Sequence, residues 1–582
     1  MTDTRTIPSS SAGTDVVTFT VKIEGENVPR SINISSVVIQ RQAYRIPSCK
    51  LIIYDGDPAQ SNFPASNEEL FIPGKKLELW AGYEADEDLL FTGIIIKQAI
   101  KIRNEKSPVL EVEAKDACIK LSTYAKSKYF AELSDQQVIE EIIQDAGLES
   151  DIENTGAALK EIVQYHASDW DFIMTRAEAN GLICFCEDGK LIAKKPDLSV
   201  TETLSVLFGA TMLEMDAEID ARSQFATVHA QTWSHANQEL VDVEATAPTI
   251  SKAGNLSPED LSDATGNNKQ VIQHGGALPE PQLQQWADAQ LMRNRLSKIR
   301  GGAKFQGYAD VKPGQLISIA GVGDRFSSTA FISGIRHELF DGGWTTTAQF
   351  GLDATAYAAA LPISAFPAAA YGPAIKGLHT GIVTDLEDPL NEFRVKIKIP
   401  SISMQDEGMW ARMMMPDAGN NRGFFFRPEV GDEVLIGFLN EDPNYPVILG
   451  GLHSSAKATP LQQKNDNHEK GLQTRSEMKW VWNDEKKSFT TETPAGKKII
   501  VDEDAGEIQI ADENGNKFLM NADGITIEAA KAINIKAGTD LKMEALNAEL
   551  KASASGKLNA SGTMEVSSSG STTVKGSIVQ IN

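Results

Sequence analysis

Large apolar residues recur at a fixed spacing near the C-terminus, and this spacing is the strongest constraint on what the chain can fold into. A period of eight residues fits neither a heptad coiled coil nor an eleven-residue helical repeat. The residues between them are mostly Gly, Ser, Thr, Asn, Ala and Lys, and the Ser/Gly-rich stretch towards the end of the chain has poor helix propensity. The apolar positions, with one shift in phase after Met543, are Ile525, Ile527, Ile533, Ile535, Leu541, Met543, Leu550, Leu558, Val566 and Val574.

The eight-residue period favours a β-helix or prism. One chain with one or two large apolar residues per repeat cannot bury a core of its own. Three chains wound around a common axis can bury one, with each repeat directing its apolar residues inward, so residues 491–582 predict a trimeric β-helix needle. The needle would taper, because the inner residues become smaller towards the C-terminus. A disordered Ser/Gly-rich tail, or a helix near 540–555, are the alternatives.

Composition bounds the class of protein. The 582 residues predict about three to five domains. A formal net charge of -25 argues against a nucleic-acid partner, because such proteins concentrate Lys and Arg. It also disfavours electrostatic docking on an anionic membrane. The one segment that resembles a membrane span, 357–375, contains three prolines and is interpreted instead as an interdomain linker.

The four cysteines do not make a disulfide scaffold, and their usage suits a reducing compartment. Cys184 and Cys186 form an isolated C-x-C motif with no second Cys/His pair nearby, whereas a zinc site needs about four ligands. We therefore interpret these cysteines as buried strand thiols and expect no metal and no cofactor.

The first half of the chain predicts two β-barrels around an α+β segment. Strict alternation from Val17 to Ile23 indicates a half-buried strand. Ser134 and Gln137 form a capping box at the start of a helix, and a second helix begins near Ser168. A polar stretch over 240–280 is interpreted as a loop. The predicted segments are a flexible arm at 1–14, a first barrel at 15–120, an α+β insertion at 121–200, and a second barrel at 201–355 with a helix at 282–300 closed by Gly301.

The second half predicts an Ala/Pro linker, a small barrel, a connector and the needle. Five short strands with glycine turns over 376–455 indicate an OB-fold barrel. Phe424, Phe425 and Phe426 could serve as a nucleic-acid stacking platform. The basic groove that such a platform needs is absent, so we interpret them as core or packing aromatics. The linker spans 356–375 and the connector 456–490.

The sequence contains no catalytic motif that we can assign. It has no phosphate-binding loop and no nucleophile elbow, and we expect no catalytic residues. Asp502, Asp504 and Glu513 have the offset of a calcium loop, but Glu507 occupies the position that requires glycine. A turn between tail strands is the better interpretation.

The order of these modules resembles the VgrG family, the spike proteins of contractile injection systems, which are related to the hub and needle of contractile phage tails. Residues 163–195 and 286–323 resemble the family's hub segments. The most specific segment is FRPEVGDEVLIGFLNEDPNYPVILGGLHS at 426–454, which resembles its OB signature. The matched signature residues are Pro428, Gly431, Glu433, Val434, Phe438, Asp442, Pro443 and Pro446.

The resemblance implies a non-enzymatic homotrimer that links the inner tube and baseplate to a puncturing tip. Implied partners are an inner-tube ring protein, baseplate proteins, effector cargo and a PAAR-like cap near Ile578, Val579 and Ile581. It implies assembly in the bacterial cytoplasm without a signal peptide, followed by delivery or release outside the cell. The alternatives are an envelope-degrading tail enzyme of a phage, for which a hydrolase domain is missing, and a trimeric adhesin.

Overall fold

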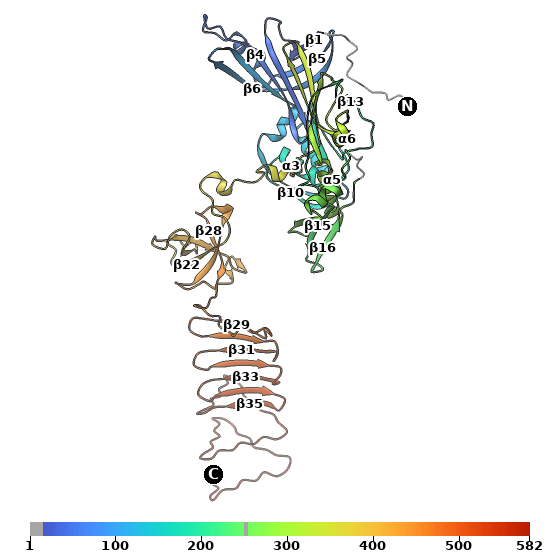
Figure 1. The fold of residues 1–582 in the computed structure, drawn as a ribbon. Helices are drawn as coiled ribbons and strands as arrows, with labels where there is room; N and C mark the ends of the chain where they lie inside the picture. Colours follow the sequence, from blue (N-terminus) through green and yellow to red (C-terminus); the bar gives the residue numbers. More distant parts are fainter. Residues whose placement is uncertain (1–15, 249–253, 582) are drawn as a thin grey trace. The chain divides into compact units, whose positions relative to one another are not determined.

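The computed structural model describes residues 16–248 and 254–581. The chain is mainly β and divides into two compact units, Met1–Ala374 and Ile375–Asn582 (Figure 1). The arm expected at 1–14 lies outside the described residues. Among the residues that are described, no helix is long and apolar enough to cross a membrane.

A large sheet of 13 strands dominates the first unit. Its main path runs β14-β18-β21-β20-β3-β4-β7-β6-β5-β1-β2, and β13 and β19 attach beside β20. The N-terminal block comprises β1 Val17–Ile23, β2 Glu26–Asn27, β3 Ile34–Gln42, β4 Arg45–Tyr54, α1 Pro64–Asn67, η1 Glu69–Phe71, β5 Lys76–Tyr83, β6 Asp86–Arg103 and β7 Lys106–Lys115. The later block comprises β13 Leu204–Leu207, β14 Met212–Ile219, β18 Ile299–Gln306, β19 Leu316–Ala320, α6 Gly323–Phe326, β20 Ser328–Phe340 and β21 Gly343–Phe350.

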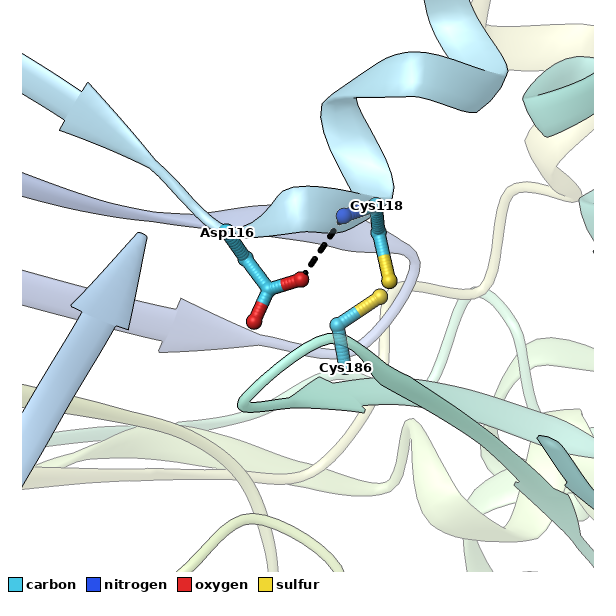
Figure 2. A group of neighbouring side chains, drawn as sticks. All are labelled: Asp116, Cys118 and Cys186. Atoms are coloured by element: carbon cyan, nitrogen blue, oxygen red, sulfur yellow. Dashed lines mark hydrogen bonds between the residues drawn. The ribbon is translucent and has the colours of Figure 1, made fainter. Parts of the chain in front are cut away.

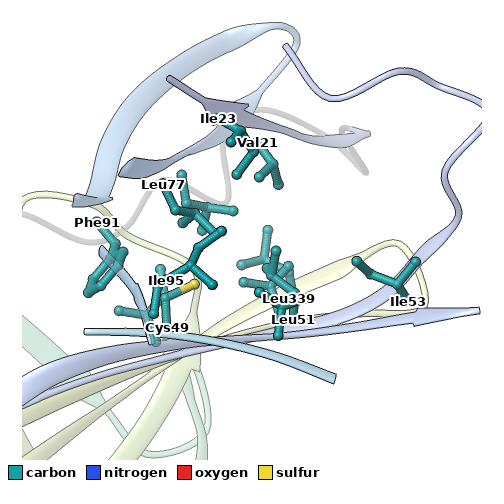
Figure 3. Packing of buried hydrophobic residues seen from close by; sticks show 14 of the residues in the cluster. Val21, Ile23, Cys49, Leu51, Ile53, Leu77, Phe91, Ile95 and Leu339 are labelled. Atoms are coloured by element: carbon teal, nitrogen blue, oxygen red, sulfur yellow. The ribbon is translucent and has the colours of Figure 1, made fainter. Parts of the chain in front are cut away.

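The two blocks that the sequence predicts as separate barrels are joined in this sheet. Strand β3 pairs antiparallel with β20, which places Ile39 opposite His337. Strand β4 covers only one edge of β3. The pairing with β20 provides hydrogen-bond partners for the backbone groups on the other edge. Each block still has its own apolar core. Figure 3 shows that Leu339 of β20 packs among the N-terminal residues, so the later block also contributes to the first core.

An α+β segment with its own core follows the N-terminal block, as the sequence predicts. The capping box is confirmed: Ser134 accepts a hydrogen bond from the Gln137 N–H, and the Gln137 side chain accepts one from the Ser134 N–H. Ser168 caps the next helix. The elements are η2 Ala117–Ser122, β8 Ala125–Leu133, α2 Asp135–Asp145, β9 Glu149–Ile152, β10 Leu159–Ser168, α3 Asp169–Ala179, β11 Ile183–Glu187 and β12 Lys190–Lys194.

The loop predicted at 240–280 is wrong: the segment contains regular structure, which its high polarity concealed because most of its strand residues stay exposed. The helix predicted at 282–300 is confirmed and spans Glu280 to Leu296. The expected closure of that helix by Gly301 is wrong, because Gly301 lies in strand β18. The elements here are β15 Thr227–Ser234, β16 Glu239–Glu244, α4 Pro258–Thr265, β17 Lys269–His274 and α5 Glu280–Leu296.

The Ala/Pro-rich segment contains only single turns, α7 Tyr357–Ala360 and η3 Pro367–Ala370. Its first residue is tied to α3: the Tyr357 hydroxyl donates to Asp171 at 2.8 Å, and its N–H donates to Glu178 at 2.7 Å. The boundary between the two units falls after Ala374, which agrees with the predicted linker.

The second unit begins with a closed five-stranded barrel, which confirms the predicted OB fold. Its core is formed by residues such as Val395, Ala411, Val434 and Ile448, all fully buried. The elements are β22 His379–Asp385, β23 Val395–Lys398, β24 Met409–Met413, β25 Ala418–Gly419, β26 Arg422–Gly423, β27 Glu433–Phe438, η4 Leu439–Glu441 and β28 Pro446–Gly451.

A seven-stranded antiparallel sheet follows, with each strand paired to the next in sequence. The sheet begins at Glu469, inside the segment predicted as a connector at 456–490. In the described part of the chain beyond Glu528, no further helix or strand is formed. The strands are β29 Glu469–Gln473, β30 Lys479–Asn483, β31 Ser488–Glu492, β32 Lys498–Asp502, β33 Glu507–Ala511, β34 Lys517–Asn521 and β35 Gly524–Glu528.

Candidate functional site

One face of the C-terminal sheet carries two parallel columns of large apolar side chains. Because side chains alternate across a strand, the cross-strand register decides which residues share this face. The first column runs through Leu472, Trp480, Thr491, Ile499, Ile510, Phe518 and Ile527. The second runs through Lys470, Trp482, Phe489, Val501, Ile508, Met520 and Ile525. Twelve of the fourteen positions are apolar, the exceptions being Thr491 and Lys470, and we call the fourteen together the apolar face.

The apolar face is open to solvent in the single chain. Trp480 is 53% exposed, Ile510 49% and Ile525 63%. Large contiguous apolar surfaces of this kind mark an interaction site. The outer positions of the opposite side of the same strands are mainly polar, as in Glu507 and Asn521, so the sheet has one side suited to water and one that requires a partner.

The predicted needle residues divide into two groups. Ile525 and Ile527 lie on β35 and extend the two columns of the apolar face. The other eight lie beyond the last strand, and all of them are exposed: Ile533, Ile535, Leu541, Met543, Leu550, Leu558, Val566 and Val574. The expected cap residues Ile578, Val579 and Ile581 are exposed as well. In this single chain, none of these eleven residues is brought into a core.

The OB signature residues form a turn, a core strand and a tight loop. Gly431 adopts a φ of 90°, and its N–H donates to the Val383 carbonyl at 2.8 Å, which clamps the turn against β22. Val434 is fully buried, and the Glu433 carbonyl accepts the Leu452 N–H at 3.0 Å. Phe438 packs against the barrel core. These contacts stabilise the barrel.

The second half of the signature closes the loop between β27 and β28. Asp442 accepts the Asn444 N–H at 2.9 Å, and its carbonyl accepts the Tyr445 N–H at 3.0 Å. Pro443 follows Asp442 in this loop, and Pro446 is buried opposite Phe438 at the start of β28. The loop is therefore short and held by its own hydrogen bonds.

The three consecutive phenylalanines of the OB domain are not core residues. Phe424, Phe425 and Phe426 are 52%, 75% and 56% exposed, so their interpretation as packing aromatics fails for the single chain. Both ends of the tripeptide are anchored. The Phe424 N–H donates to the Asp417 carbonyl at 2.9 Å, and Arg427 donates to the carbonyls of Leu386 and Arg394.

The acidic residues with a calcium-loop offset lie at turns between strands, as predicted. Asp502 accepts the Ala505 N–H at 2.9 Å, which shapes the turn between β32 and β33. Glu513 pairs with Lys497 at 2.6 Å, and the hydrogen bond from that lysine lowers the pKa of Glu513. Asp502 is thus occupied by its own turn, and Glu513 by Lys497 of the turn that precedes β32.

A buried cluster that the sequence analysis missed lies in the first unit. Asp116, Cys118 and Cys186 place one ligand atom each within 4.8 Å of one another (Figure 2). Burial raises the pKa of the Cys186 thiol well above its usual value. The two cysteines are 68 positions apart in sequence, so the C-x-C motif, which draws attention to Cys184 instead, gives no local signal of this grouping.

Family comparisons agree with the arrangement of the two units. The model of the Alg8 N-terminal domain matches residues 13–341, more than half of the 582 residues. The chain belongs to the Alg8 N-terminal domain family. A second family model, the type VI secretion system/phage-baseplate injector OB domain, matches residues 379–453. Within the Alg8 N-terminal domain family, this chain thus carries the OB domain of VgrG and phage-baseplate spike proteins, which confirms the resemblance seen in the sequence.

Individual relatives match over short segments. The type VI secretion system spike protein VgrG1a of Pseudomonas aeruginosa is 30% identical over 74 residues, which are 13% of this chain and 12% of that protein. The spike protein VgrG3 of Vibrio cholerae is 29% identical over 112 residues, 19% of this chain and 11% of that protein. The match therefore spans only about a tenth of the length of these curated relatives. Among solved structures, a tail protein from Neisseria meningitidis MC58 is 18% identical with a TM-score of 0.44, covering 60% of this chain and 100% of that chain.

Proposed function

We propose that this protein is the central spike, hub plus needle, of a contractile injection system and that it works as a homotrimer. The observation that carries the proposal is the apolar face of β29–β35, continuous over seven strands and exposed in the single chain. Burying apolar surface stabilises an assembly by about 25 cal/mol per Å². Burial of a face of this size therefore strongly favours association of the chains.

Three copies of the sheet can bury their apolar faces against one another, whereas one copy cannot bury its own. Three apolar faces turned towards one axis form a prism whose core consists of Trp480 and Trp482 at one end and Ile525 and Ile527 at the other. The eight-residue apolar spacing continues the same core beyond Glu528, with each chain supplying one side. Two sheets packed face to face would also cover the apolar surface, and the mass of the assembly separates these cases.

The hub and the OB barrels have supporting roles in this proposal. The two β blocks of the first unit each have a core, and three chains would present six such blocks to a sixfold inner-tube ring. The OB barrels would form a collar, and a PAAR-like protein would cap the tip near Ile578, Val579 and Ile581. Inner-tube, baseplate and cargo proteins are the remaining proposed partners.

The proposed work is mechanical, with no bond chemistry. Sheath contraction would drive the trimer through a target envelope, and interwound chains would transmit the force without fraying. The four free cysteines, all buried, suit assembly in the reducing bacterial cytoplasm before delivery outside the cell.

The mass of the purified full-length chain in solution tests the proposal. Multi-angle light scattering should give three times the 63.1 kDa chain mass, and the species should resist detergent and heat. A measured mass equal to that of a monomer or a dimer would overturn the proposed trimeric needle. In a producing strain that lacks the gene, the intact chain should restore injection of target cells, whereas a chain truncated after the OB barrel should not.

A further inference from the structure

We propose that Asp116, Cys118 and Cys186 form a buried binding site for one zinc ion in the hub. The site is independent of the spike function proposed above, because it lies within the α+β segment of the first unit. Neither the family comparisons nor the sequence motifs assign a metal to this chain.

The geometry fits a small thiophilic cation. The three ligand atoms lie within 4.8 Å of one another, and zinc bonds of about 2.3 Å to sulfur and 2.0 Å to oxygen at tetrahedral angles place ligand atoms about 3.5–3.8 Å apart. Figure 2 shows the two sulfurs directed towards each other, with the Asp116 carboxylate beside them. Small movements of the side chains would complete the bonds.

The chemistry of the donors selects the metal. Two thiolates with one carboxylate favour zinc over calcium or magnesium, which prefer all-oxygen shells. On binding, Zn²⁺ would form two Zn–S bonds and one Zn–O bond, and the two thiol protons would pass to solvent. Zinc has no redox chemistry and needs no other reactant.

The carboxylate is already aligned by the backbone. One oxygen of Asp116 accepts the Cys118 N–H at 2.8 Å, and the other accepts the Gly189 N–H at 3.0 Å. Asp116 is 1% exposed, and in the described part of the chain no lysine, arginine or histidine forms an ion pair with it. A buried carboxylate is costly without a charge partner, and a bound cation would supply one. Backbone hydrogen bonds to a ligating carboxylate are the usual support of a metal site.

The cluster is closed to solvent: Asp116 is 1% exposed, Cys118 is fully buried and Cys186 is 4% exposed. Phe185 and Glu187, the neighbours of Cys186 on β11, line a cavity of about 320 Å³ on the other face of the strand, because successive side chains of a strand point to opposite faces. A water would complete the four ligands that are usual for zinc with three protein ligands. The bound ion would then join η2 to the β11–β12 hairpin.

Metal uptake by the full-length chain tests the site. Reduced, chelator-stripped protein should take up about one Zn²⁺ per chain, measured by mass spectrometry of the metal, and Co²⁺ in its place should give thiolate-to-cobalt charge-transfer absorption. Cys118→Ser and Cys186→Ser should each lose at least tenfold in affinity. Cys184→Ala is the matched control, because Cys184 is a fully buried thiol on the same strand outside the cluster, and it should bind as the intact chain does.

The cobalt spectrum of the intact chain does not depend on any variant folding. Absence of both zinc uptake and thiolate absorption from the reduced, folded protein would overturn the site. Loss of the metal in Cys184→Ala to the same degree as in Cys186→Ser would also overturn it, as would a disulfide between Cys118 and Cys186 as the only reaction of the cluster. A trimer that binds no zinc would leave the spike proposal intact, and a monomer that binds zinc would leave this one intact.

Discussion

Trp482 and Phe489 face each other across strands β30 and β31, with ring centroids 5.5 Å apart, at the upstream end of the apolar face. Such aromatic pairs contribute about 0.5–1.5 kcal/mol beyond the area they bury. Trp482 nevertheless remains 41% exposed, so the pair does not form a fully packed core within one chain. A surrounding sheet from another copy would complete it.

A charge on the apolar face should therefore break the assembly. Ile510→Asp would place three carboxylates at one level of the proposed axis, each buried and beside like charges. We expect the light-scattering mass to fall from that of the three chains proposed to that of one, with the far-UV circular dichroism of the first unit retained.

Gln509→Asp is the matched control for this change, because Gln509 precedes Ile510 on β33 and points to the opposite side. It should leave the mass unchanged. Equal masses for the two variants would show that the apolar face does not hold the chains together.

Protonation of one histidine of the first unit should make stability depend on pH. His337 is buried, with its ring nitrogen 2.9 Å from the Thr346 hydroxyl, and burial together with the Arg41 charge lowers its pKa to about 3. In the unfolded chain this histidine takes up a proton near pH 6.5, whereas in the folded chain the same side chain stays neutral. Stability is thus fully present above about pH 6.5 and declines as the pH falls towards 3, by about 2 kcal/mol between pH 7 and pH 5.

His337→Gln should remove this part of the pH dependence. Its denaturation midpoint, followed by urea titration of the full chain at several pH values, should change less between pH 7 and pH 5 than that of the intact protein. Parallel pH profiles of the variant and the intact protein would mean that His337 takes up its proton in the folded protein as readily as in the unfolded chain.

Patterns among residues that are close together in the sequence predicted much of the fold. The capping box at Ser134 and Gln137 was readable because its residues are three apart, and the OB strands were readable from alternation within each strand. The pairing of Ile39 with His337 left no such signal, because the two strands are nearly 300 residues apart. The Asp116 cluster was missed for the same reason. The exposed phenylalanines were misjudged because apolar composition alone does not tell a core residue from an interface residue.

One buried ion pair should matter far more than an exposed one. Asp135, 4% exposed in its side chain, accepts from Arg176 at 2.6 and 2.9 Å and from Asn180 at 2.8 Å, which joins α2 to α3. Arg176→Ala would leave the carboxylate buried without its cation and should cost about 2–4 kcal/mol of unfolding free energy.

Lys128→Ala provides the comparison, because Lys128 pairs with Glu141 at 2.8 Å where both side chains are at least 40% exposed. It should change the unfolding free energy by less than about 0.5 kcal/mol. Urea titration of both variants checks the difference, and equal costs would contradict it.

Gly301 and Gly302 are neighbours in β18 but should respond differently to alanine. A Cβ on Gly301 would lie 2.1 Å from the Asp216 carbonyl oxygen of β14, whereas one on Gly302 would lie 3.4 Å from the nearest atom, a Thr347 methyl of β21. The backbone of β14 can relieve the first contact only by breaking its pairing with β18. Gly301→Ala should therefore lower the unfolding free energy by more than about 2 kcal/mol, or yield insoluble protein, while Gly302→Ala should change it by less than about 1 kcal/mol.

Comparing the Gly301→Ala and Gly302→Ala variants also tests whether Gly301 lies in strand β18 rather than at the end of a helix. Alanine in place of a glycine that ends a helix at a positive φ costs about 1–2 kcal/mol, whereas alanine in place of a glycine packed against a neighbouring strand costs more. Thermal melts of the two variants separate these cases: a mild effect of Gly301→Ala, equal to that of Gly302→Ala, would mean that β14 and β18 are not in close contact at this point.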